Sequence, residues 1–139
     1  MRTKGKGKLI GTMPAEVADA LGIQAKPLSV YVPNDLRKHL KQSNHQEDYM
    51  KYGEQLINII NEPHWTGSPL PNQYLFVKRI GQDYVYVPIH YRHGHFSIRS
   101  FYIKDNHSKI ERLISQNHLK SIQQKNPSGR NSEARVLSL

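Results

Sequence analysis

The sequence predicts an α+β fold in which N-terminal helices pack on one face of a C-terminal antiparallel meander sheet. Apolar residues recur at helical spacing in the first half of the chain, whereas residues 74–103 alternate apolar and polar side chains between turn signals. With 139 residues, the chain is long enough for one domain with its own core. We therefore expect one globular domain over residues 13–124, with a flexible basic arm at 1–12 and a disordered tail at 125–139.

Three helices are expected in the first half, each with an apolar face and a stop signal. They are a short helix from Pro14 to Leu21, a basic helix capped by Asn34 that carries Leu36 and Leu40, and a helix from Gln46 to the residues before Pro63. A strand is expected at Leu28–Val32, and the Pro- and Gly-rich segment 62–72 is interpreted as a loop. A closing helix capped by Asn106 or Ser108 follows the sheet.

The segment 84–103 is predicted as a β-hairpin with two different faces. Side chains alternate along a strand, so the odd-numbered residues of 85–91 share an apolar face, and the even-numbered residues beside them include His90 and Arg92. A two-residue turn at His93-Gly94 sends the chain back along the first strand. We expect a cationic, proton-exchanging patch on a rigid sheet.

The returning strand changes its apolar phase, because Ile98 is apolar at an even position and Phe101 at an odd one. A β-bulge near Arg99 would explain the change and would place Ser100 and Tyr102 on the polar face. A regular strand would place Ser97 and Arg99 there instead. Bulges are frequent beside active sites, which favours the first arrangement.

Further basic side chains are expected on the same face. His95 lies opposite Arg92 across the hairpin turn. The strand before the hairpin contributes either Lys78 or Arg79, depending on whether the turn at Gly81 spans two or three residues.

The charge of the chain indicates an anionic partner. Twenty Lys and Arg residues against eleven Asp and Glu residues give a formal charge of +9, which favours nucleic acid, most simply RNA. No apolar run approaches the roughly 20 residues that a membrane-spanning helix needs, so no membrane partner is expected.

Imidazole is the acid or base available at neutral pH, because the chain has eight His residues and no Cys. The absence of Cys also excludes disulfides and a thiolate zinc site. His90, His93 and His95 form an H-x-x-H-x-H run, but His93 would point away from the other two in the hairpin and no carboxylate lies nearby. We expect neither a metal nor another cofactor.

From about Leu28 to Leu113, the order of elements resembles the phage nuclease domains grouped with barnase, EndoU, colicin and RelE-like toxins (the BECR group). Members tend to carry a Lys-His pair in the first helix, a second His before the next helix, a Tyr early in that helix and the run S-F-Y on the last strand. This chain carries Lys38-His39, His45, Tyr49 and Ser100-Phe101-Tyr102 at those places. The middle-strand cation, usually Lys, corresponds here to His90, with Arg92 two residues later.

The resemblance implies a BECR-like nuclease fold, and the residue types fit metal-independent RNA cleavage. That reaction needs a base for the 2′-hydroxyl proton, an acid for the leaving 5′-oxygen and cations for the charge on phosphorus. We expect the catalytic residues to be His39, His90, Arg92, Ser100 and Tyr102. Substrate-binding residues are expected at Lys38, His45, Lys78, Arg79, His95 and Arg99.

These expectations describe an endoribonuclease toxin that acts on tRNA or mRNA in the cytoplasm of the producing or the target cell, delivered by a phage or a secretion system. Its protein partner would be an acidic immunity protein or antitoxin. Two alternatives remain: a non-catalytic RNA- or DNA-binding module in which Tyr84, Tyr86 and Tyr102 stack on bases, and an inactive phage packaging or virion domain. The His content favours the enzyme, because Lys and Arg alone suffice to bind phosphate. The oligomeric state is left open.

Overall fold

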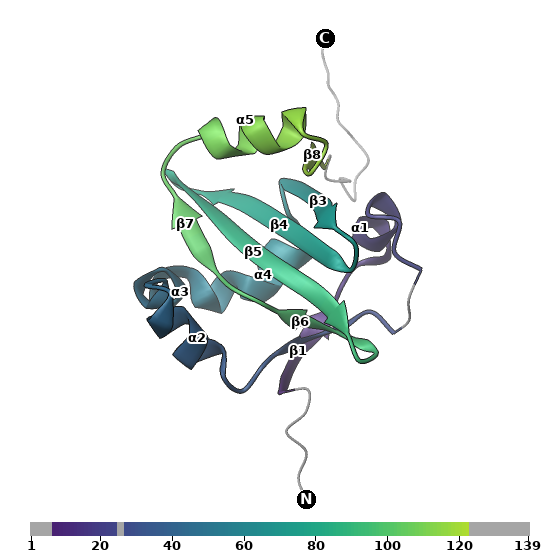
Figure 1. The fold of residues 1–139 in the computed structure, drawn as a ribbon, viewed down its shortest axis with the longest axis vertical. Coiled ribbons are helices and arrows are strands. Elements are labelled where there is room, and N and C mark those ends of the chain that lie inside the picture. The colour runs from purple at the N-terminus through teal and green to yellow at the C-terminus, as the bar shows by residue number, and fades with distance from the viewer. Residues whose placement is uncertain (1–6, 25–26, 123–139) are drawn as a thin grey trace, which may run out of the picture.

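The computed structural model describes residues 7–24 and 27–122, which form an α+β domain (Figure 1). In chain order its elements are β1 (Lys8–Thr12), α1 (Ala15–Ala20), β2 (Ser29–Val32), α2 (Leu36–Gln42), α3 (Gln46–Tyr52), the 3₁₀ turn η1 (Gly53–Gln55), α4 (Leu56–Asn61), β3 (Trp65–Leu70), β4 (Gln73–Ile80), β5 (Asp83–Arg92), β6 (His95–Ile98), β7 (Tyr102–Lys104), α5 (Ser108–Ser115) and β8 (Lys120–Ser121). The α+β class is therefore confirmed.

The sheet is mixed and includes strands from both ends of the domain. Its strand order is β1-β2-β6-β5-β4-β3-β8, and β7 also pairs with β5. Strand β2 runs parallel to β6, with Val30 opposite Phe96, whereas the other pairs are antiparallel. The prediction of a purely antiparallel C-terminal meander was therefore wrong, because β2 brings the N-terminal segment into the sheet.

Part of the expected basic arm is a strand. Lys8–Thr12, predicted within the flexible segment 1–12, forms β1 and pairs with β2. Residues 1–6 and the predicted tail at 125–139 lie outside the described residues, so the prediction for them stands as made.

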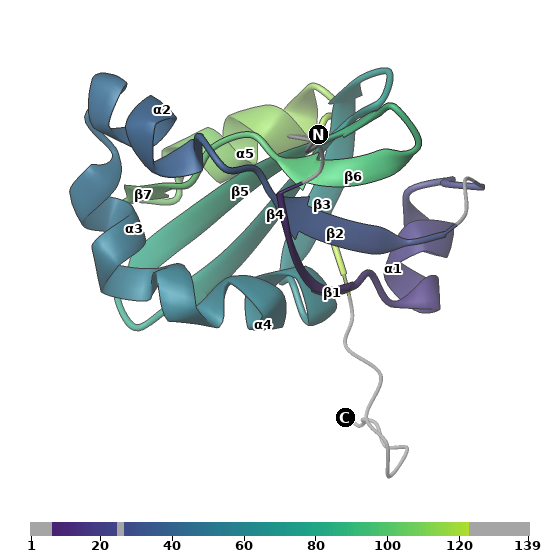
Figure 2. The same cartoon turned by 90° about the horizontal axis from the view of Figure 1, so that it is seen from below.

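Helices cover both faces of the sheet, and the predicted packing of the N-terminal helices on one face is not confirmed. The larger core joins α1, α2 and α4 to the apolar face of β5 and includes Leu40, Ile59 and Val87. A smaller core lies on the other face, where Ile110 of α5 packs among residues that include Tyr86. Figure 2 shows α4 and α5 on opposite sides of the sheet. The closing helix thus covers part of the polar face of the hairpin.

Two segments differ from the predicted helix and loop. The single helix expected from Gln46 is divided into α3, η1 and α4 at Gly53. The expected loop 62–72 contains β3, which pairs with β4 and β8. The Pro- and Gly-rich composition of this segment favours a loop, although the segment forms a strand. Gly67 is needed in the strand because a Cβ there would lie 2.0 Å from the backbone oxygen of His118.

The hairpin geometry is as predicted. Its two-residue turn has positive φ at His93 (55°) and Gly94 (84°), and Arg92 pairs with His95. The turn at Gly81 also spans two residues, because Ile80 pairs with Asp83.

The predicted bulge near Arg99 is confirmed by the strand register. Ile98 pairs with Ile89, but Tyr102 pairs with Tyr86, so three residues of the returning chain face two of β5. One of those two is Pro88, whose carbonyl accepts a 2.8 Å hydrogen bond from the Arg99 amide. In an antiparallel strand the N–H and C=O of one residue point to the same neighbouring strand. Pro88 has no N–H, so it leaves no unpaired backbone donor facing the bulge.

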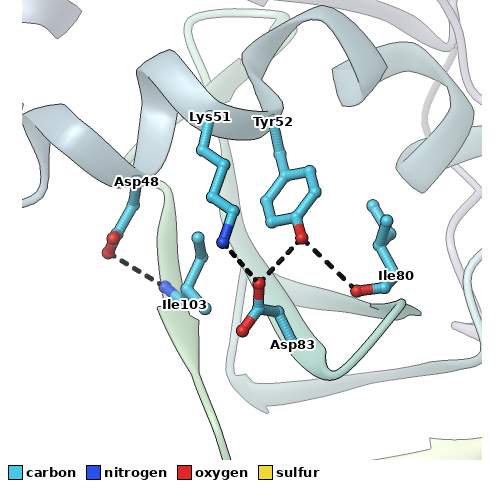
Figure 3. A network of polar contacts seen from close by, with 6 residues as sticks. All are labelled: Asp48, Lys51, Tyr52, Ile80, Asp83 and Ile103. Atoms are coloured by element: carbon cyan, nitrogen blue, oxygen red, sulfur yellow. Dashed lines mark hydrogen bonds and ion pairs between the residues drawn. The ribbon is translucent and has the colours of Figure 1, made fainter.

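Helix α3 is fixed to the sheet at two places (Figure 3). Asp48 Oδ2 accepts a 3.1 Å hydrogen bond from the backbone amide of Ile103 on β7. At the other end, Asp83 Oδ2 accepts hydrogen bonds from Tyr52 Oη at 2.7 Å and from Lys51 Nζ at 3.0 Å. These contacts hold both ends of α3 beside the sheet.

The variant Asp83→Asn is expected to lower the free energy of unfolding by about 1 kcal/mol at neutral pH, since it weakens a charge-assisted contact near the surface. Hydrogen bonds from Tyr52 and then Lys51 lower the pKa of Asp83. The contribution of Asp83 to the free energy of unfolding is therefore complete above the unfolded pKa of about 4. It is lost as pH falls through the lower pKa of the folded state. Urea unfolding from pH 7 to pH 3 should show wild type and variant converging in acid, and a constant difference would contradict this role.

Candidate active site

A groove crosses the polar face of the sheet beside α5. It consists of two cavities of about 390 and 210 Å³ that share Gln73 and Arg99. The larger is also lined by His90 and Arg92, near the hairpin turn. The smaller lies between the sheet and α5 and is also lined by Lys109. We call the two cavities together the sheet groove, with a His90 end and a Lys109 end.

His90 lies in a row of side chains that runs across four strands. The register places Tyr31 beside Ser97, Ser97 opposite His90 and His90 opposite Gln73. Ser97 is buried, and His90 is half-buried. The imidazole therefore projects from the middle of a rigid sheet.

Burial and neighbouring cations keep His90 neutral. Burial is the largest cause, and the charges of Arg99 and Arg92 add to it, followed by His95 and His93; together they lower the pKa of His90 from 6.5 to about 4. At neutral pH the ring is an uncharged imidazole, which can act as a proton acceptor but not as an acid. The arginines are exposed and line the same cavity, so an anion would meet two guanidinium groups there.

NMR titration of the His90 ring is expected to give a midpoint near pH 4, well below 6.5. The variant Arg99→Gln should raise this midpoint, because a positive charge is removed, yet leave it below 6.5, because burial remains the largest cause. Arg79→Gln at the far end of the sheet is the matched control and should leave it unchanged. A wild-type midpoint near 6.5 would contradict this account of the site.

The Lys109 end is built on aromatic side chains. Tyr86 and Tyr102 stack with ring centroids 5.0 Å apart and an interplanar angle of 8°. Lys109 Nζ lies 4.9 Å from the centroid of the Tyr102 ring and 5.4 Å from that of Tyr86. Burial, followed by the charge of Arg112, lowers the pKa of Lys109. The bulge places Tyr102 on the polar face, as predicted from the phase change, but in the cavity of Lys109 and not in that of His90 and Arg92.

His45 approaches Tyr102 from the helical side. The two ring centroids are 5.3 Å apart, and His45 Nδ1 lies 3.6 Å from Asp48 Oδ2. Tyr86, which pairs with Tyr102, and His90 are four positions apart on β5, a distance of about 13 Å along a strand. His45 lines neither cavity. Because it lies beside Tyr102, at the end away from His90, the two imidazoles do not flank one phosphate.

The other predicted site residues are placed as follows. His95 is half-buried beside Tyr31, with ring centroids 5.2 Å apart. Lys38 and His39 are exposed on α2, and neither lines the two cavities described here. Ser100 is half-buried in the bulge and likewise lines neither cavity.

Lys78 and Arg79 lie away from His90. The two-residue turn at Gly81 puts Arg79 opposite Tyr84 on the polar face and Lys78 opposite Val85 on the apolar face. Arg79 lies over the ring of Tyr84, and Lys78 Nζ donates to the backbone oxygen of Glu62 at 2.7 Å. The structure does not bring either cation to the sheet groove.

Sequence reasoning missed Gln73 and Lys109. Gln73 directly precedes the segment 74–103, whose alternation predicts the sheet, yet it lies directly opposite His90. Lys109 directly precedes the buried Ile110, and its place in the groove depends on how α5 packs across the sheet. For Gln73, extending the alternation of the predicted strand by one residue would have been a usable signal.

Within residues 7–24 and 27–122, no group of three or more His, Asp or Glu side chains is arranged to hold a metal ion. In the same residues, no helix has the length and apolar character required to cross a membrane.

The sequence of the domain matches a family of nuclease domains. Residues 8–112 match the family described as phage-Barnase-EndoU-ColicinE5/D-RelE like nuclease 3. The chain belongs to this family, and the resemblance seen in the sequence is thereby confirmed. No curated protein and no solved structure is significantly similar to the chain.

Proposed function

We propose that this nuclease domain is a metal-independent endoribonuclease toxin that acts at the sheet groove. The observation that supports this most is the neutral His90 imidazole in one cavity with Arg92 and Arg99. A neutral base beside two guanidinium groups matches the needs of RNA cleavage, where a proton leaves the 2′-hydroxyl while charge builds on the phosphate.

In the proposed reaction, His90 accepts the proton of the 2′-hydroxyl as that oxygen attacks phosphorus. A 2′,3′-cyclic phosphate forms, the bond from phosphorus to the 5′-oxygen breaks, and that oxygen leaves with a proton from a second group. Arg92 and Arg99 stabilise the phosphorane charge. The bound phosphate also offsets the positive field at His90, which raises the pKa of the imidazole and makes it a better base in the complex.

The second proton-transfer group is proposed to come from the helical side. His39 on α2 is the residue expected from the sequence. The variant His39→Gln is expected to lower the cleavage rate by about 10²–10⁴-fold, because it removes the acid. Full activity of this variant would remove His39 from the scheme.

A binding module without catalysis is less well supported by the packing. Two of the three tyrosines expected to stack on bases, Tyr84 and Tyr86, are 8% and 0% exposed. Only Tyr102 of that set lines the groove. Base stacking along a row of tyrosines is therefore not available at this face.

Wild-type protein incubated with total RNA in excess EDTA tests the proposal. Cleavage that ends in 2′,3′-cyclic phosphates is expected, since no metal takes part in the scheme. Intact RNA that is bound by the protein would instead support the binding module. Activity that is abolished by EDTA and restored by Mg²⁺ would refute metal independence.

The proposed setting is a bacterial cytoplasm, of the producing or the target cell, reached by way of a phage or a secretion system. The proposed partner is an acidic immunity protein or antitoxin whose carboxylates cover Arg92 and Arg99. Growth arrest on expression, relieved by His90→Ala, is the cellular counterpart of the RNA assay.

A further inference from the structure

We propose that the Lys109 end of the sheet groove binds one unpaired nucleobase and favours guanine and uracil over adenine and cytosine through the Lys109 ammonium group. This inference rests on the proposed function and extends it, since it assigns the base that lies next to the phosphate at His90.

The shape of the cavity fits one flat, partly apolar group. The cavity of about 210 Å³ lies between β4 and β5 on one side and α5 on the other. Leu75 and Pro88 from the sheet and Leu113 from α5 form its apolar lining. A base inside a duplex cannot enter a cavity closed on two sides, so the nucleotide must be unpaired.

The cavity is continuous with the place proposed for the phosphate. Arg99 and Gln73 line both cavities, so a nucleotide can place its phosphate at the His90 end and its base at the Lys109 end. No other described cavity shares residues with the one that contains His90. A bound RNA strand would therefore run from Arg92 and Arg99 towards α5.

Lys109 has donors to offer to a ligand. Among residues 7–24 and 27–122, its Nζ makes no hydrogen bond or ion pair and lies near the rings of Tyr86 and Tyr102. The two rings hold the ammonium group in place without using its protons. Three N–H donors are thus available beside the cavity.

An ammonium group donates hydrogen bonds and cannot accept them, which determines the base that it favours. Guanine and uracil carry a carbonyl oxygen where adenine and cytosine carry an amino group. The carbonyl accepts from Lys109, whereas the amino group places a donor against a donor. Gln73 discriminates less, because its amide both donates and accepts.

The test uses 3′-nucleotides, which bind without being cleaved. In two matched pairs the members differ at the exocyclic group and at the proton on the adjacent ring nitrogen: uridine against cytidine 3′-monophosphate, and inosine against adenosine 3′-monophosphate. Calorimetry on the wild-type chain is expected to show about tenfold tighter binding of the carbonyl member of each pair. Lys109→Met keeps the aliphatic stem and should reduce both ratios to about one, whereas Lys120→Met on β8 should leave them unchanged.

Equal affinities within both pairs on wild type, or unchanged ratios in Lys109→Met, would overturn the inference. If Lys109→Met fails to fold, NMR shifts of the Leu113 methyl groups on wild type decide: shifts with uridine but not with cytidine 3′-monophosphate support it, and no difference refutes it. The outcome is separate from the proposed function, because a chain that distinguishes these nucleotides but leaves RNA intact fails only as a ribonuclease. A chain that cleaves RNA but binds all four nucleotides alike fails only in base selection.

Discussion

The variant His90→Ala is expected to lower the rate of RNA cleavage by about 10²–10⁴-fold, which is the usual contribution of a general base. The reason is the position of the imidazole, which is held neutral in one cavity with Arg92 and Arg99. Because the ring is only half-buried and uncharged at neutral pH, its removal breaks no ion pair, and the melting temperature should change little. Single-turnover cleavage of a short RNA at saturating enzyme measures the effect on the chemical step.

The matched control is His93→Asn in the hairpin turn. Asn tolerates the positive φ of 55° that His93 adopts, so the turn is kept while an exposed imidazole is removed. This variant should cleave RNA like wild type. Full activity of His90→Ala would exclude the base role even if the chain proves to be a ribonuclease.

The variant Phe101→Ala is expected to lower the free energy of unfolding by about 3–5 kcal/mol, the cost of truncating a buried Phe. Phe101 is 0% exposed and meets the Tyr49 ring edge-on with centroids 5.2 Å apart. Phe101 is also the last residue of the bulge, so its burial helps to fix which side chains of β7 face the core. Urea unfolding measures the change.

Met50→Ala serves as the control for Phe101→Ala, because Met50 is 75% exposed and its truncation should cost little. Phe101→Leu should lie between the two, since it keeps most of the apolar volume. A cost below about 1 kcal/mol for Phe101→Ala would mean that the bulge is held by the backbone alone.

The hairpin could be predicted in detail because its signals are local. Alternation of apolar side chains gave the faces of β5, the His93-Gly94 pair gave the turn, and the phase difference between Ile98 and Phe101 gave the bulge. Each of these depends on residues a few positions apart, where strand periodicity and turn chemistry act directly.

Elements that depend on distant pairing could not be predicted in this way. The parallel contact of β2 with β6 joins segments far apart in the chain, and nothing in Ser29–Val32 specifies its partner. Strand β3 contains Gly67 and Pro69, which locally favour a turn, and it is held by β4 and β8.

The candidate site was predictable to the extent that it lies on the hairpin. His90 and Arg92 follow from alternation, and Tyr102 follows from the bulge. Lys109 does not, since its place depends on α5 crossing the polar face. The same packing covers Tyr84 and Tyr86, which strand periodicity alone left facing solvent.

The late completion of the sheet has a consequence for synthesis on the ribosome. Strand β2 can pair with its parallel neighbour β6 only after β6 has left the ribosome, and Lys109 leaves the ribosome later still. Sheets built from such long-range contacts fold slowly, because the intervening chain must be closed into a loop first. A nascent chain whose β6 is still inside the ribosome therefore has neither Arg99 in the groove nor a partner for β2. Under the proposed function, cleavage of RNA would begin only after nearly the whole domain has left the ribosome.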